Sequence, residues 1–305
     1  MRSPYAPIRR RRLPVLVAVV VGLSACAGGG SETLVGVSSA KLSFGSMGKS
    51  CGYHLKSSIS SNDRGIQRDM QIESHYTATV DSVGEEGHLY IRYDLNEFSV
   101  ARFVQGNVAY DEGSEAFRGQ SVRLTMSPAG DIVRRQGLEV TDLTTPEGRS
   151  LKDILMRTFA LRSQRYPQEA VRMGDSWTRT LLASDEDRTS LRIAGGHLQG
   201  QLTRTYQVQA FVAYKGHSCA QILVTTAGKY TGEGLGQRDR VTMDIDVEGA
   251  GTVYFDYESH CIVSEKEHTK ATQRGTRPPD RLGEEGKVEL LIIESDVEIH
   301  LEPAA

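Results

Sequence analysis

From residue 51 onward, apolar and polar side chains alternate along much of the chain. The alternation is clear in residues 70–80 and 88–95, and it recurs in residues 201–212 and 287–301. Successive side chains of a strand point to opposite faces, so a period of two predicts strands with one buried face. Short turn signals such as residues 127–130, Ser-Pro-Ala-Gly, separate the runs. The pattern predicts a mainly β or α+β fold, with a curved, half-barrel-like antiparallel sheet.

One segment has helical periodicity instead. Residues 150–153, Ser-Leu-Lys-Asp, form a start that resembles a capping box, and Leu151, Ile154, Leu155 and Phe159 then fall on one face. Pro167 ends the pattern. We therefore expect one helix near residues 150–165, which covers an open face of the sheet.

The chain also shows signs of an internal repeat. A Tyr is followed by Gly-His after ten residues in the segment 76–88 and after nine in the segment 206–217. The hairpin pattern of residues 122–133 recurs in residues 253–263. These parallels predict two similar β-rich units, residues 51–166 with the helix and residues 167–305, although shared strand and turn composition can imitate a duplication.

The first 25 residues have the character of a secretory signal peptide. Arg2 and four consecutive Arg at positions 9–12 precede an apolar run over residues 13–23. A membrane-spanning helix needs about 20 apolar residues, so this run is too short to be one. The run ends in Leu23-Ser24-Ala25-Cys26, which resembles the lipobox of bacterial lipoproteins. The alternative is an ordinary cleaved signal followed by an incidental Cys.

The lipobox resemblance implies cleavage before Cys26 and acylation of its thiol and its new amino group. About two lipid signals are enough for a stable membrane anchor, and a Cys26 acylated at both groups would carry three acyl chains. Ala27 stands where an Asp tends to retain such proteins in the inner membrane, so the resemblance implies the outer membrane, facing the periplasm. Residues 26–50 then form a tether, since 12 of the 24 residues at 27–50 are Gly or Ser.

Charge and cysteine content narrow the picture. Removal of the five signal Arg lowers Lys plus Arg from 36 to 31 against 39 acidic residues, a net charge of about −8 that argues against a nucleic-acid partner. With Cys26 assigned to lipid, Cys51, Cys219 and Cys261 remain. An oxidising compartment allows one disulfide. We expect Cys219–Cys261, because both lie in strand-like segments of the same half, with Cys51 left over.

No motif predicts a catalytic, metal or cofactor site. Residues 43–50 end in Gly-Lys-Ser like a phosphate-binding loop, but Ser43 stands where that loop needs Gly, and no helical period follows. Ser50 matches the Gly-x-Ser-x-Gly nucleophile pattern without its strand and helix context. The eight His are scattered singly, and only His260-Cys261 are adjacent. We expect a solvated turn or a disulfide there, not a metal site.

The most individual motif is Gly174-Asp175-Ser176-Trp177, which opens the second unit. Gly frees the backbone for a turn, Asp can tie that turn by hydrogen bonds, and Trp177 can anchor an apolar contact. The combination of this Gly-Asp-x-Trp motif with the lipobox and two β-rich halves resembles the layout of a family of uncharacterised bacterial envelope lipoproteins. The layout is also loosely similar to the Lol-type lipoprotein carriers, whose half-barrel and helical lid enclose acyl chains.

Three functions are compatible with these features. A non-enzymatic lipoprotein that binds a hydrophobic ligand or an acyl chain agrees with one open sheet face and a lid helix. A structural or assembly partner in the envelope would instead have a filled interior. A hydrolase of unknown substrate lacks any well-placed nucleophile or metal arrangement.

Overall fold

The computed structural model describes residues 32–43, 49–63, 65–84, 86–112, 117–127, 132–137, 166–167, 169–182, 197–235, 240–277 and 287–302. Their regular elements are strands, and no helix among them has the length and apolar composition needed to span a bilayer. The bounds of the strands are β1 (Thr33–Leu34), β2 (Ser50–Asp63), β3 (Ile66–Val83), β4 (Leu89–Val104), β5 (Asn107–Glu112), β6 (Ser121–Met126), β7 (Ile132–Gly137), β8 (Ser176–Leu182), β9 (His197–Tyr214), β10 (His217–Leu235), β11 (Arg240–Asp256), β12 (Cys261–Arg277) and β13 (Lys287–Leu301).

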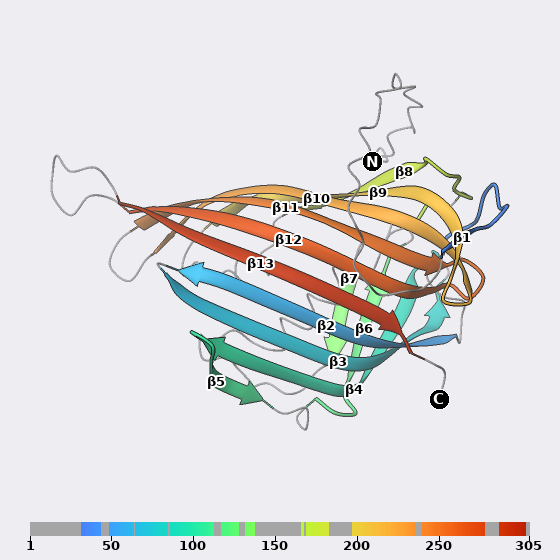
Figure 1. Ribbon diagram of the computed structural model, residues 1–305, viewed down its shortest axis with the longest axis horizontal. Coiled ribbons are helices and arrows are strands. Elements are labelled where there is room, and N and C mark those ends of the chain that lie inside the picture. The colour runs from blue at the N-terminus through green and yellow to red at the C-terminus, as the bar shows by residue number, and fades with distance from the viewer. Residues whose placement is uncertain are drawn as a thin grey trace, which may run out of the picture. The chain divides into compact units, whose positions relative to one another are not determined.

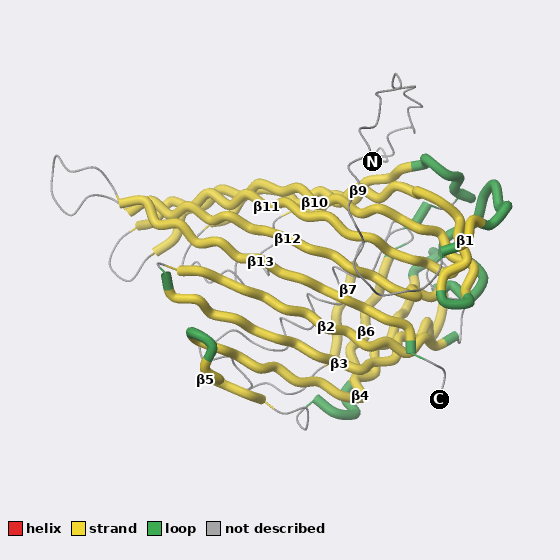
Figure 2. The backbone as a smooth tube through the Cα atoms, in the orientation of Figure 1, coloured by secondary structure: helices red, strands yellow, loops and turns green. Residues whose placement is uncertain are grey.

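All of these strands belong to one antiparallel sheet (Figures 1 and 2). Its order is β1-β9-β10-β11-β12-β13-β2-β3-β4-β6-β7, with β8 also paired to β9 and β5 to β4. The sheet is open, since β1 and β7 end the path. The mainly β, antiparallel fold predicted from the alternating pattern is therefore confirmed.

The two predicted β-rich units share this sheet. Strand β13 pairs with β2 in an unbroken register from Leu291↔Asp63 to Leu301↔Tyr53, and residues 31–305 form one compact unit. Figure 1 shows β13 lying directly beside β2. The helix expected near residues 150–165, the signal peptide of residues 1–25 and Cys26 lie outside the described residues.

We call the sheet face that carries Tyr53, Tyr76 and Phe255 the inner face, and the opposite one the outer face. One large apolar cluster occupies the inner face and draws its members from β2, β3, β4, β6, β9, β10, β11 and β12. Aromatic contacts run through it: Tyr53 and Tyr76 have ring centroids 5.3 Å apart, and Tyr166 lies 4.5 Å from Phe255. Burial of these side chains is the main stabilising contribution to the fold.

The outer face is polar where β12, β13, β2 and β3 run side by side. Successive cross-strand pairs between β12 and β13 are Lys266–Glu298 at 2.8 Å, His268–Asp296 at 2.8 Å and Lys270–Glu294 at 3.6 Å. Opposite charges directly across an antiparallel pair are favourable, although exposed pairs stabilise only weakly. This ladder accounts for the polar positions 294, 296 and 298 in the alternating pattern of residues 287–301.

Candidate functional site

A second apolar cluster lies on the inner face, farther along the strands. It consists of Ile245, which is buried, and four partly buried neighbours: Tyr230, Met243, Val247 and Ala271. We call this group the Ile245 cluster. Ile245 has the same strand parity as Val253 of the main core, so both clusters share one face of β11. Unlike the main core, the Ile245 cluster leaves most of its side chains partly exposed.

A buried polar row separates the two clusters. The guanidinium of Arg204 donates from Nη2 to Oε2 of Glu267 at 2.6 Å, and Thr226 donates from Oγ1 to Oε1 of the same carboxylate at 3.0 Å. The side chains of Arg204 and Glu267 are 3% and 9% exposed. Burial by itself lowers the pKa of Arg204, but Tyr206 and Glu267 outweigh it and the net pKa is raised. Arg204 therefore stays positively charged, and its contact with Glu267 marks the end of the main core.

Tyr206 adds an uncharged polar group beside that row. Its hydroxyl is buried and has no hydrogen-bond partner among the described residues, while its ring faces the Arg204 guanidinium at 5.6 Å. Burial raises the pKa of Tyr206, so the phenol stays protonated at neutral pH. A buried hydroxyl without a partner is costly unless another group approaches it.

The Gly174-Asp175-Ser176-Trp177 motif forms the turn that leads into β8. Gly174 has φ 87°, a conformation that favours Gly, and Oδ2 of Asp175 accepts a hydrogen bond from the backbone N–H of Arg172 at 2.8 Å. Trp177 then stacks on Tyr206 with ring centroids 5.3 Å apart and planes 9° apart. The motif therefore positions β8 against the main core.

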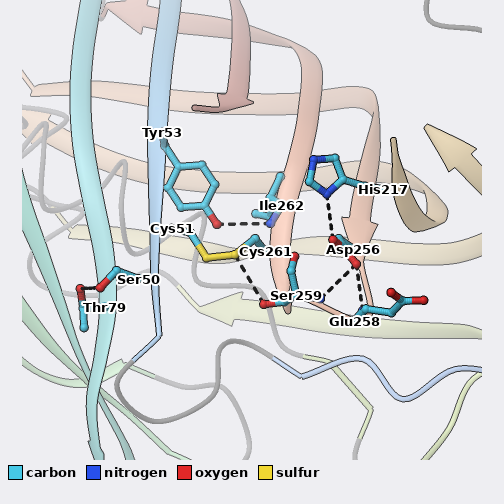
Figure 3. The surroundings of a disulfide bond; sticks show 10 residues. All are labelled: Ser50, Cys51, Tyr53, Thr79, His217, Asp256, Glu258, Ser259, Cys261 and Ile262. Atoms are coloured by element: carbon cyan, nitrogen blue, oxygen red, sulfur yellow. Dashed lines mark hydrogen bonds and ion pairs between the residues drawn. A yellow bond between two sulfur atoms is a disulfide. The ribbon is translucent and has the colours of Figure 1, made fainter. Parts of the chain in front are cut away.

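The disulfide differs from the expected one. Cys51 and Cys261 are joined, with Cα atoms 6.2 Å apart (Figure 3). Cys219 is a buried free thiol. The expected Cys219–Cys261 pairing is wrong because the registers place Asp256 of β11 directly between these two residues. Cys219 packs with Val212 and Val263, whereas Cys261 belongs to the main core. A disulfide, one of the two alternatives expected at the His260-Cys261 turn, is therefore present there, with Cys51 as the partner of Cys261.

Two serines, Ser50 and Ser264, have surroundings that resemble those of a nucleophile, but their contacts are structural. Ser50, which matched the Gly-x-Ser-x-Gly pattern, begins β2 and hydrogen bonds to Thr79 at 2.8 Å. Ser264 Oγ lies 3.3 Å from Nδ1 of His300, and Nε2 of that imidazole lies 3.6 Å from Glu298. This resembles a serine, histidine and acid series, but Ser264 is 2% exposed, so a substrate does not reach its hydroxyl.

A groove of about 670 Å³ lies on the other side of the sheet from the Ile245 cluster. Its lining includes Lys229, Asp246 and Arg274, all at outer-face positions. Arg274 donates to Asp246 at 3.0 Å, and Lys229 lies 3.8 Å from the same carboxylate. Because these charges are exposed and already paired, we assign this groove to the solvated outer face.

Three histidines that look scattered in the sequence are neighbours in the sheet. The registers place His300 opposite His54 and His54 opposite His75. The sequence places His75 and His300 in the predicted strands 70–80 and 287–301. Strand register, however, depends on which strands pair, and the β13–β2 pairing joins residues more than 200 apart in the chain.

Comparison with known proteins leaves the family open. No family model matches the chain, and no curated protein matches it. Among solved structures, one that describes lipid–protein interactions in lipovitellin is similar at a TM-score of 0.41 and 14% identity, covering 85% of this chain and 26% of the lipovitellin chain. The chain thus spans about a quarter of the length of that protein, and we draw no conclusion about function from a likeness at this level.

Proposed function

We propose that this protein is a lipid-anchored, periplasmic component of the bacterial cell envelope that binds a hydrophobic ligand, an acyl chain, on the Ile245 cluster. The observation that carries the proposal is the contrast between the two clusters on the inner face. The main core is closely packed, whereas Tyr230, Met243 and Val247 of the Ile245 cluster are only partly buried. Apolar surface of this kind gains free energy when another apolar group covers it.

The size of that gain can be set by the apolar area that a ligand covers. Covering on the order of 200 Å² of apolar surface contributes about 5 kcal/mol at 25 cal/mol per Å². The buried Arg204–Glu267 pair bounds the apolar surface of the Ile245 cluster on the side of the main core. A ligand with one unbranched hydrocarbon chain suits such a strip better than a bulky polar molecule does.

The binding part of the proposal is tested with the full-length protein purified in detergent and a fluorescent fatty acid as the probe. Val247→Asp places a carboxylate among partly buried apolar side chains, and we expect at least tenfold weaker uptake because a charge is costly to desolvate. Val288→Asp is the matched control, since Val288 is 66% exposed on the outer face, and we expect unchanged uptake.

Met243→Gln provides a milder second variant that keeps the length of the side chain. Near-ultraviolet circular dichroism checks that each variant retains the wild-type fold. No uptake by the wild-type protein, or equal loss in the Val288 control, contradicts binding at the Ile245 cluster.

The anchor is tested separately, by Cys26→Ser. Because the lipobox resemblance assigns the acyl groups to Cys26, we expect the variant to move from the membrane fraction to the soluble periplasmic fraction. Unchanged fractionation contradicts the lipid anchor and leaves the ligand-binding test unaffected.

A second candidate is an assembly partner in the cell envelope. The extensive, well-filled main core favours it, because a filled interior needs no ligand. Crosslinking in cells distinguishes the two: one dominant protein adduct, together with no fatty-acid uptake, supports the assembly role.

A further inference from the structure

The outer face carries a row of imidazoles across three adjacent strands. His300 of β13, His54 of β2 and His75 of β3 stand opposite one another in the register. The rings of His54 and His75 are stacked, with centroids 4.1 Å apart and planes 12° apart.

A carboxylate from outside these strands joins the pair. Glu302 follows β13, and its Oε1 lies 2.6 Å from Nδ1 of His75. Its backbone N–H donates to the carbonyl of Gly52 at 2.9 Å, which places the Glu302 side chain beside a residue without one. A Cβ on Gly52 would lie 3.6 Å from Cβ of Glu302. That distance is ordinary van der Waals contact, so the approach of Glu302 across β2 to His75 of β3 does not depend on the missing side chain of Gly52.

We propose that His54, His75 and Glu302 form a binding site for a divalent transition-metal ion, with Zn²⁺ as the best match. Each residue offers one ligand atom, and these atoms all lie within 4.8 Å of one another. Two imidazoles and one carboxylate are ligands that Zn²⁺ accepts, with water in a fourth position. In a tetrahedral site with bonds of about 2.0–2.2 Å, ligand atoms lie roughly 3.4 Å apart. Imidazole lone pairs lie in the ring plane, so one of the two stacked rings has to turn out of the stack for both to point at one ion.

Two further carboxylates occupy the positions expected of outer partners. Glu73 Oε1 lies 2.6 Å from Nε2 of His54, and Glu97 Oε2 lies 4.0 Å from Nε2 of His75. A histidine that binds a metal commonly donates its other ring N–H to a carboxylate, which fixes the ring and raises its basicity. A carboxylate can only accept, so Nε2 of His54 carries the proton and Nδ1 holds the lone pair.

The proton balance of binding follows from the same contacts. In the ion-free form, the hydrogen bond between His75 and Glu302 requires a proton on Nδ1 of His75. The ion takes the place of that proton at Nδ1, and the imidazole then carries its proton on Nε2, which lies 4.0 Å from Glu97, so the exchange balances without loss of a proton to solvent. The surrounding charges favour a cation, because Glu73, Glu97 and Glu302 all lie beside the two imidazoles. Lys56, which lies 3.3 Å from Glu73, offsets part of this negative charge.

The site is accessible to an ion from solution. The side chains of His54, His75 and Glu302 are 22%, 31% and 32% exposed. By contrast, the exposed His268–Asp296 pair on the same face, at 2.8 Å, is not part of a three-ligand group among the described residues. It provides a matched control with the same imidazole–carboxylate chemistry.

The test uses the full-length protein without a polyhistidine tag, stripped with chelator and titrated with ZnCl₂ by calorimetry. We expect one site per chain, and at least tenfold weaker binding in His54→Gln, His75→Gln and Glu302→Gln. Glu73→Gln should weaken binding by about tenfold through the outer partner, and His268→Gln should leave it unchanged.

A spectroscopic measurement tests the ligand set directly. Co²⁺ in place of Zn²⁺ should give visible absorption bands of a four-coordinate site in the wild-type protein and in His268→Gln, but not in His75→Gln. These bands and the matching affinity losses support the site. No binding by the wild-type protein, or equal loss in His268→Gln and His75→Gln, overturns it, and circular dichroism confirms that each variant is folded.

Discussion

Cys51 and Cys261 lie 210 residues apart in the sequence, yet their disulfide joins the start of β2 to the start of β12. Strand β13 lies between these two strands in the sheet. The hydroxyl of Tyr53 accepts a hydrogen bond from the backbone N–H of Ile262 at 3.2 Å, so the neighbouring residues also hold the two strands together (Figure 3). The disulfide thus connects the two β-rich halves where the main core is closely packed.

Removal of this disulfide should lower stability substantially. Cys51→Ala with Cys261→Ala should reduce the free energy of unfolding by about 2–5 kcal/mol, since the closed loop is long. Urea denaturation measures the change. Dithiothreitol should shift the wild-type transition toward that of the double variant and leave the double variant unmoved. If the reductant has no effect on the wild-type midpoint, the pairing is wrong.

Cys219 should not react with thiol reagents in the folded protein. Burial raises the pKa of the Cys219 thiol to about 12, and Asp256 adds to this, so the reactive thiolate is absent at neutral pH. Ellman's reagent should detect no thiol in the native protein and one after unfolding without reductant. Two thiols after unfolding would show that Cys26 is not acylated, and thiol release at pH 8 from the native protein would contradict the burial of Cys219.

Asp256 should stabilise the turn before Cys261 in a pH-dependent way. Burial raises its pKa, but hydrogen bonds from Ser259, His217 and the backbone of Glu258 outweigh this and the net pKa is lowered. A lowered folded-state pKa means that the contribution is present above the unfolded value, about 3.9, and disappears as the pH falls through the folded value.

The matching experiment is Asp256→Asn. At pH 7 we expect it to cost about 1–3 kcal/mol, the usual range for hydrogen bonds to a charged group. The difference from the wild-type protein, measured by urea denaturation, should shrink as the pH falls below about 4. A difference that stays constant from pH 7 to pH 2 contradicts an ionised Asp256 in the folded protein.

The buried and exposed ion pairs of β12 should differ in their effects. Glu267→Gln removes the carboxylate charge that the buried Arg204 guanidinium contacts at 2.6 Å, so we expect a loss of about 3–5 kcal/mol in the free energy of unfolding. Glu298→Gln breaks the Lys266–Glu298 pair, whose side chains are 62% and 43% exposed, and should cost about 1 kcal/mol or less. Urea denaturation at low and at 1 M salt measures both, and equal losses contradict the burial of Arg204.

The strands could be predicted from the sequence because alternation is a local property. The run from Lys287 to Leu301 shows it clearly, and that segment is β13. The Gly174–Trp177 turn was likewise visible, because Gly and Asp act within a few residues of each other. The disulfide partner of Cys261 could not be predicted from the sequence, since the choice between Cys51 and Cys219 depends on how the strands that carry them are arranged in the sheet.

The sequence by itself determined the β content of this protein, most of its strand positions and the polar or apolar character of each face, because these depend on neighbours within a few residues. Only the tertiary structure determined that β13 pairs with β2, and that pairing brings His54, His75 and Glu302 together. The tertiary structure also separated the Ile245 cluster from the main core, because it places Arg204 against Glu267, 63 residues farther along the chain. The physical reason is that strand pairing and register are set by burial across the whole sheet, in which residues far apart along the chain contribute together.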